Sequence, residues 1–78
     1  ATRIAKSLLV QLLIMRAEEV LRRYATGERN FQGEDLRGQN FSQRNLADAD
    51  FSGADIRGTN FAGAVLRQAC FRHAIAGL

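Results

Sequence analysis

The side chains with the most obvious capacity for chemistry are the single cysteine and the single histidine of the chain, Cys70 and His73. At a spacing of three residues they could be two metal ligands on one helical turn, or a nucleophile and its general base. Two side chains complete neither kind of site, and no Asp or Glu follows Asp55 to supply another group. The sequence therefore predicts no enzyme activity, no metal site and no cofactor.

Three aspartates, Asp35, Asp50 and Asp55, are the remaining candidates for acid–base chemistry. Each stands directly before a bulky apolar residue, in a position that asparagine takes elsewhere in the same stretch of chain. Short polar side chains at such positions bond to nearby backbone groups and favour turns. We therefore interpret the three carboxylates as turn residues. The equivalent asparagines are Asn30, Asn40, Asn45 and Asn60.

A bulky apolar residue recurs at every fifth position from residue 31 to residue 71. A five-residue step turns a helical side chain by about 140° and sends successive strand side chains to opposite faces, so neither element collects these residues on one side. The chain must therefore turn a corner in each repeat, and glycines two positions later, such as Gly33 and Gly53, suit such corners. The predicted core comprises Phe31, Leu36, Phe41, Leu46, Phe51, Ile56, Phe61, Leu66 and Phe71.

Segments 35–38, 49–53 and 54–58 read Asp-Leu-Arg-Gly, Ala-Asp-Phe-Ser-Gly and Ala-Asp-Ile-Arg-Gly. They resemble the A(D/N)LXX pattern of the pentapeptide-repeat family, and the resemblance extends over residues 29 to 75. Residues 21–31 are similar to the helical lead-in that family members place before the first coil. The resemblance implies a mainly β fold: a right-handed quadrilateral parallel β-helix, or solenoid, of about two coils with an N-terminal α-helical cap. It also implies four pentapeptides per coil, with the bulky residues pointing inward.

If four repeats complete one coil, residues twenty positions apart stack on the same side of it. Like residues then stack on like, which gives the interior two aromatic and two aliphatic walls. The predicted ladders are Phe31 with Phe51 and Phe71, Phe41 with Phe61, Leu36 with Ile56, and Leu46 with Leu66.

An amphipathic helix is predicted over residues 16 to 24, where it can cover the first coil. Gly27 suits a left-handed residue at the helix end. The pairs in favourable i,i+4 order on the polar face are Glu18 with Arg22 and Glu19 with Arg23. The apolar face of this cap comprises Ala17, Val20, Leu21 and Tyr24.

Both ends of so short a solenoid need a cover. Residues 8–15 are apolar on every side of a predicted helix, yet they fall short of the roughly twenty residues that span a bilayer. They indicate a contact with a protein partner, or with a membrane surface beside Arg3 and Lys6. After Phe71 the repeat decays. Unless the tail 74–78 folds over that opening, a second copy or a partner chain is expected to cover it. The alternative is that the chain is cut from a longer solenoid, whose further coils would cover the opening.

The net charge of +3 comes wholly from residues 1–27, because residues 28–78 hold six basic and six acidic residues. A neutral coil disfavours nucleic-acid binding, which needs a clustered basic face. It also disfavours the DNA-mimic activity of family members that bind DNA gyrase, since that activity implies a strongly negative rod. One cysteine and no transmembrane stretch predict a reducing, cytoplasmic location.

These observations favour a noncatalytic structural or protein-interaction module that self-associates through the solenoid end or the N-terminal apolar helix. The alternatives are a topoisomerase-directed DNA mimic and a peripheral membrane tether. The expected organisation is a helix and cap over residues 1–27, the β-helix over 28–75 and a tail over 76–78. The candidate interaction residues are Leu8, Leu9, Leu12, Leu13, Arg37, Arg57, Arg67 and Arg72.

Overall fold

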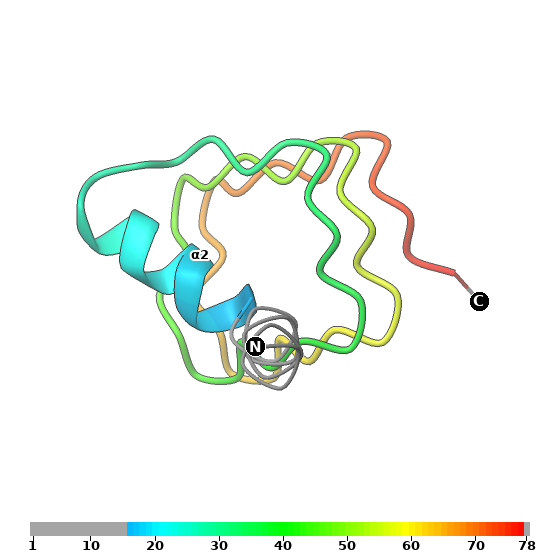
Figure 1. Ribbon diagram of the computed structural model, residues 1–78, viewed down its shortest axis with the longest axis horizontal. Helices are drawn as coiled ribbons and strands as arrows, with labels where there is room; N and C mark the ends of the chain where they lie inside the picture. Colours follow the sequence, from blue (N-terminus) through cyan, green and yellow to red (C-terminus); the bar gives the residue numbers. More distant parts are fainter. Residues whose placement is uncertain (1–15, 78) are drawn as a thin grey trace, which may run out of the picture.

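The computed structural model describes residues 16–77. One helix, α2 (Arg16–Ala25), precedes a chain that winds in stacked, roughly square coils (Figure 1). Within residues 16–77, no helix combines the length and the apolar character needed to span a bilayer. The candidate interaction residues Leu8, Leu9, Leu12 and Leu13 lie outside the described residues.

Each coil takes twenty residues, because parallel β-bridges join residues that lie twenty positions apart. The bridged pairs are Asn30 with Asp50, Asp35 with Asp55, Asn40 with Asn60, Asn45 with Val65, Asp50 with Cys70 and Asp55 with Ile75. We number the sides of the coils one to four in chain order. They begin at residues 30, 35, 40 and 45, and each recurs one coil later.

Backbone hydrogen bonds between coils keep the same register. The N–H of Phe31 donates to the carbonyl of Asp50 (2.8 Å), and the N–H of Asp50 donates to the carbonyl of Arg29 (2.7 Å). A third bond joins the corners, from the N–H of Gly33 to the carbonyl of Ser52 (2.9 Å). Each bridge is a single residue pair, and residues 16–77 contain no strand longer than that. The expected mainly β character therefore holds only in part.

The corner after each bulky residue explains why no bridge extends into a strand. The carbonyl of the bulky residue accepts the N–H three positions later, as in the bond from Ala54 to Phe51 (3.0 Å). The residue two positions after the bulky one has φ between 59° and 71°, as in a type II turn. Five of these corners are glycines, and the other four are Gln43, Asp48, Gln68 and His73.

The Asn and Asp residues that precede each corner bind the turn that follows them. The Oδ1 atom of Asp50 accepts the N–H of Ser52 at 2.9 Å. All seven Asn and Asp residues that stand before a bulky residue accept the equivalent N–H two positions later. The interpretation of Asp35, Asp50 and Asp55 as turn residues is therefore confirmed.

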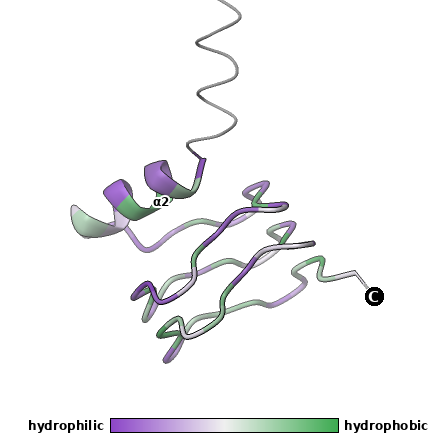
Figure 2. Ribbon diagram, turned by 90° about the horizontal axis from the view of Figure 1, so that it is seen from below, coloured by the Kyte–Doolittle hydropathy of each residue, from purple (hydrophilic) through white to green (hydrophobic). Residues whose placement is uncertain are grey.

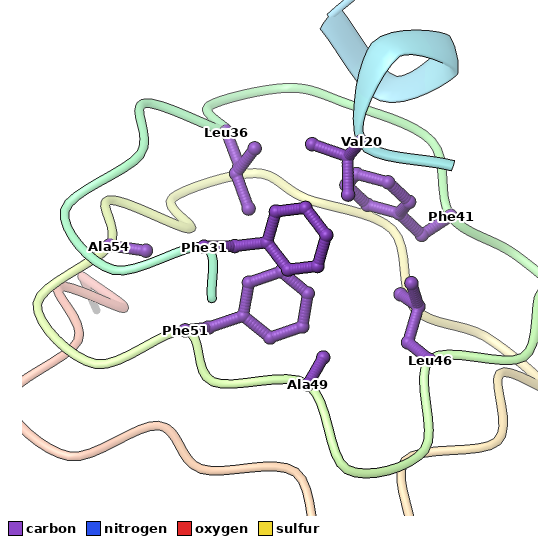
Figure 3. Close-up of a cluster of buried hydrophobic side chains, with 8 residues drawn as sticks. All are labelled: Val20, Phe31, Leu36, Phe41, Leu46, Ala49, Phe51 and Ala54. Atoms are coloured by element: carbon purple, nitrogen blue, oxygen red, sulfur yellow. The ribbon is translucent and has the colours of Figure 1, made fainter. Parts of the chain in front are cut away.

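The bulky residues of the first coil fill its interior. Figure 3 shows them pointing inward, together with Val20 of α2 and the small residues Ala49 and Ala54. Val20 is 1% exposed, and the side chains with no exposure at all are Phe31, Leu36, Phe41, Leu46, Ala49, Phe51 and Ala54. The small residues fit beside the large ones because positions two apart on extended backbone point the same way.

The phenylalanines stack in two ladders. The ring centroids are 5.6 Å apart for Phe31 and Phe51, 5.3 Å for Phe51 and Phe71, and 5.7 Å for Phe41 and Phe61. The predicted stacking of phenylalanines twenty residues apart is thus confirmed. The two ladders also meet, because Phe61 packs edge-on against Phe71 at 5.7 Å.

Helix α2 lies across one end of the stack (Figure 2). Val20 belongs to the core cluster, and the neighbouring residues Ala17, Leu21 and Tyr24 pack against it. The hydroxyl of Tyr24 donates to the carbonyl of Ala47 (2.9 Å), and Nη2 of Arg23 donates to the carbonyl of Asn30 (3.4 Å). Both carbonyls lie on the first coil, where a preceding coil would otherwise supply donors. The helix therefore takes the place of a coil.

Helix α2 ends in a Schellman motif. The N–H of Glu28 donates to the carbonyl of Arg23 (3.0 Å), and the N–H of Gly27 donates to the carbonyl of Tyr24 (2.9 Å). Gly27 has a φ of 103°, so it is the left-handed residue that the sequence predicted there. This turn leads the chain from the helix into the first coil.

The opposite end of the stack, which we call the open end, is formed by bulky residues that are only partly buried: Ile56, Phe61, Leu66 and Phe71. The tail does not cover them. Ile75 bridges Asp55 and donates its N–H to the carbonyl of Ala54 (2.9 Å), so residues 74–77 continue along the second side. The alternative in which the tail folds over the opening is wrong for residues 74–77, because the register between coils holds them at the wall.

Replacing Phe51 with alanine should lower the free energy of unfolding by about 3–5 kcal/mol, because its ring is fully buried and stacks on both Phe31 and Phe71. Phe71→Ala removes the same ring from the open end and should cost clearly less, because that ring is only partly buried. Urea unfolding followed by far-ultraviolet circular dichroism measures both losses. Equal losses would contradict this difference between the middle of the stack and its open end.

Candidate interaction surfaces

Cys70 and His73 occupy a side and a corner of the coil rather than one helical turn. Cys70 lies on the first side, with its Sγ atom 3.3 Å from Oγ of Ser52, and that hydroxyl donates to Oδ1 of Asp50. The hydrogen bond with Ser52, together with one to the backbone of Arg72, lowers the pKa of the Cys70 thiol. His73 is exposed and has a left-handed φ of 59°. Residues 16–77 contain no group of three or more His, Cys, Asp or Glu residues that could hold a metal ion.

The second side carries a ladder of alternating charges. Arg37 donates from Nε and Nη2 to the carboxylate of Asp35, at 2.9 and 2.8 Å, and Arg57 makes the same paired contact with Asp55, at 2.9 and 2.6 Å. Arg37 also lies 3.7 Å from Asp55, which links the two coils. Hydrogen bonds from these guanidinium groups hold the pKa of Asp35 and of Asp55 below the ordinary value. Both arginines are thus compensated within the chain.

Arg67 lies on the fourth side of the second coil, Arg72 lies on the first side of the incomplete third coil, and both are exposed. They take the same repeat position as the paired arginines of the second side, but the residue two positions earlier is Val65 or Cys70 instead of an aspartate. Neither forms a salt bridge within residues 16–77. Asp48, one coil earlier, shares a shallow hollow with Arg67 without reaching it as an ion pair. Two positive charges that form no salt bridge within residues 16–77 therefore lie at the edge of the open end.

The open end also presents backbone groups that are paired elsewhere in the stack. The N–H groups of Phe41 and Phe51 each donate to a carbonyl of the next coil, at 2.8 and 2.7 Å. The equivalent N–H groups of Phe61, Leu66 and Phe71 have no backbone acceptor in the part of the chain that the structure describes. A row of unpaired edge groups is a template for pairing with another polypeptide. Together with its partly buried apolar side chains, this edge makes the open end the strongest candidate for a contact site.

Arg23 has a different role from the one that its sequence spacing predicted. It forms salt bridges with Glu28 and with Glu34, the latter at 3.0 Å, and its guanidinium lies 4.9 Å from the ring centroid of Phe31. The predicted helix pairs, Glu18 with Arg22 and Glu19 with Arg23, form no salt bridge among the described residues. The fold instead points Arg23 toward the first coil, where acidic partners from later in the chain come within reach.

Two residues of the first coil that hold the cap, Glu34 and Gln39, were not predicted from the sequence. Oε1 of Gln39 accepts the N–H of Ala17 (3.1 Å), and Glu34 binds Arg23. The sequence does contain a pattern that marks these residues. They stand two positions before a bulky residue, where later repeats carry small side chains. The first coil has large polar residues there, and the later repeats have alanine or threonine: Arg29, Glu34, Gln39 and Arg44 against Ala49, Ala54, Thr59, Ala64 and Ala69.

Acid should weaken the coil through the second-side ladder. A carboxylate whose pKa is lower in the folded chain contributes stability above the unfolded pKa of about 4, and this stability is lost as the pH falls through the folded pKa. In Asp55→Asn, the free energy of unfolding should therefore depend less on pH below about 4 than it does in the wild type. Asparagine can keep the bond to the turn that Asp55 makes, which leaves the corner intact.

Urea titrations between about pH 2 and pH 7 measure this dependence. Asp48→Asn is the control, since its exposed carboxylate forms no salt bridge in residues 16–77. An acid dependence of Asp55→Asn as steep as that of the wild type would show that the ladder does not couple to folding.

Comparison with known proteins agrees with the repeat register seen in the structure. A family model described as pentapeptide repeats matches residues 28–57 and 45–75, with eight copies of the repeat. No curated protein and no solved structure matches the chain. The two matched segments together extend over more than half of the 78 residues. The chain therefore belongs to the pentapeptide-repeat family.

Proposed function

We propose that the chain is a noncatalytic module for protein–protein interaction, built on a right-handed, four-sided parallel β-helix. Its organisation is a helix and cap over residues 1–27, the β-helix over 28–75 and a tail over 76–78. Membership of the pentapeptide-repeat family is consistent with a noncatalytic repeat module. The parallel bridges in a register of twenty residues support the β-helix, because four five-residue repeats then make one coil.

The observation that carries the proposal is the difference between the two ends of the stack. At one end, α2 buries Val20 against the core and supplies donors to carbonyls of the first coil. At the other end, Phe61, Leu66 and Phe71 are partly exposed, and their N–H groups lack backbone acceptors within residues 16–77. Apolar surface and unpaired edge groups are what a partner would cover.

Self-association through the open end is the simplest form of this interaction. Helix α2 covers the other end, so the open end of one copy would pair with the open end of a second copy. Such an isologous contact closes at a dimer rather than growing into a filament. Arg37 and Arg57 contribute less to it than their exposure suggests, because each is already paired with an aspartate of its own side.

The charges lend less support to the other candidate roles. A DNA mimic needs a continuous acidic surface, whereas the acidic residues of the second side each pair with an arginine. The proposal of a membrane tether concerns residues 1–15, which lie outside the described part of the chain.

The mass of the 78-residue chain in solution tests the proposal directly. Light scattering over a range of concentrations should show a monomer–dimer equilibrium. Leu66→Gln should raise the dimer Kd by about tenfold or more, because it replaces apolar surface at the open end with a polar group of similar size. Val65→Gln should leave the Kd nearly unchanged, since Val65 is 39% exposed on the outer wall.

Circular dichroism of both variants checks that the coil is retained. A wild-type chain that stays monomeric at every concentration would overturn the proposal of self-association. Equal effects of Leu66→Gln and Val65→Gln would place the contact elsewhere on the molecule.

A further inference from the structure

Charge is distributed unevenly along the stack. All six acidic residues after residue 27 lie between residues 28 and 55, and residues 56–78 carry Arg57, Arg67, Arg72 and His73 with no acidic side chain. Arg57 is compensated by Asp55, at 2.6 Å. Arg67 and Arg72 form no salt bridge within the described residues. The edge of the open end is therefore net positive.

The backbone of the coil has a polarity of the same sign. In each repeat, two N–H groups and one carbonyl point toward the next coil, as shown by the N–H groups of Phe31 and Gly33 and the carbonyl of Arg29. The edge that faces the next coil is thus rich in donors, and the edge that faces the preceding coil is rich in acceptors. At the open end, the donor-rich edge is the one without a partner, and it adds partial positive charge to that of the arginines.

Helix α2 shows how this fold covers an end. It places apolar side chains over the core, gives donors to the acceptor-rich edge through Arg23 and Tyr24, and forms salt bridges at the rim between Arg23 and the acidic residues Glu28 and Glu34. The open end has the opposite polarity. A matching cover would combine an apolar centre with acceptors for the N–H groups and carboxylates for the arginines.

We propose that the open end binds a protein surface with an apolar centre and an acidic edge, in preference to a second identical copy of the chain. The carboxylates of that partner pair with Arg67 and Arg72, and its carbonyl groups accept the unpaired N–H groups. This inference rests on the proposed function, which identifies the open end as the contact site. The open end then binds a second copy of the chain with lower affinity than it binds such a partner.

An identical copy is the poorer partner for an electrostatic reason. Two copies joined end to end bring two sets of Arg67 and Arg72 to one interface, and neither arginine forms a salt bridge with an acidic residue of its own chain within residues 16–77. Charges closer than the Debye length, about 8 Å at physiological ionic strength, repel one another with little screening. An acidic edge on the partner turns this repulsion into attraction.

The test uses the full chain and a charge-reversed copy of it, Arg67→Glu with Arg72→Glu, as the acidic-edged probe. Sedimentation equilibrium at about 0.02 M salt should give the mixed complex a Kd at least about tenfold lower than that of either homodimer, with the difference shrinking at about 0.5 M salt. Arg22→Glu with Arg44→Glu is the matched control. It makes the same change of charge at exposed residues away from the open end, and should give no such gain.

A second variant, Arg67→Gln with Arg72→Gln, gives an independent result even if the Glu variant fails to fold. Removing the repulsion should make its homodimer tighter than that of the wild type. An unchanged or weaker homodimer, a wild-type homodimer as tight as the mixed complex, or an equal gain from the control would overturn the inference and leave the open end as the contact site. No association of any chain or mixture would overturn the proposed function as well.

Discussion

The pairing of each coil with the next, twenty residues later, is the interaction on which the rest of this structure depends. A repeat of five residues makes one backbone–backbone hydrogen bond of its own, across its corner, and its Asn or Asp side chain accepts one further N–H of the turn, as Asp50 does. Most of its other backbone groups bond to neighbouring coils. No repeat is therefore stable alone, and the sequence must bring every repeat into the same register. Phenylalanine above phenylalanine, as in Phe31, Phe51 and Phe71, packs the interior only in that register.

The same pairing makes the two ends of the stack chemically different. A coil offers mainly carbonyls toward the preceding coil and mainly N–H groups toward the next. The first coil is covered by a helix whose side chains donate hydrogen bonds, and Arg23 meets Glu34 of that coil at the rim. The positively charged and hydrogen-bond-donating side chains of α2 thus lie over acceptor groups of the first coil. The open end, with its unpaired N–H groups and arginines, presents the reverse arrangement.

The sequence predicted the interior of the coil better than its outer surface. The spacing of bulky residues at every fifth position sufficed for the phenylalanine ladders, because it leaves the chain few other ways to bury them. The sequence did not predict that single bridges would replace strands. The bridges stay single because a corner with positive φ interrupts the chain in each repeat. The partners of Arg23 were also missed. Neighbours along a helix can be read from spacing, but Glu28 and Glu34 reach Arg23 only after the chain has turned back beneath α2.

The residue two positions before an arginine decides whether that arginine is available to a partner. These two positions point outward from the same side of the coil, so an aspartate there forms a paired contact within its own repeat, as Asp35 and Asp55 do. Where Val65 and Cys70 take that place, Arg67 and Arg72 form no salt bridge within residues 16–77. This departure from the repeat pattern favours binding of a partner. Where the aspartate before the turn is replaced, the arginine two positions later has no carboxylate in its own repeat and can pair with one from a partner.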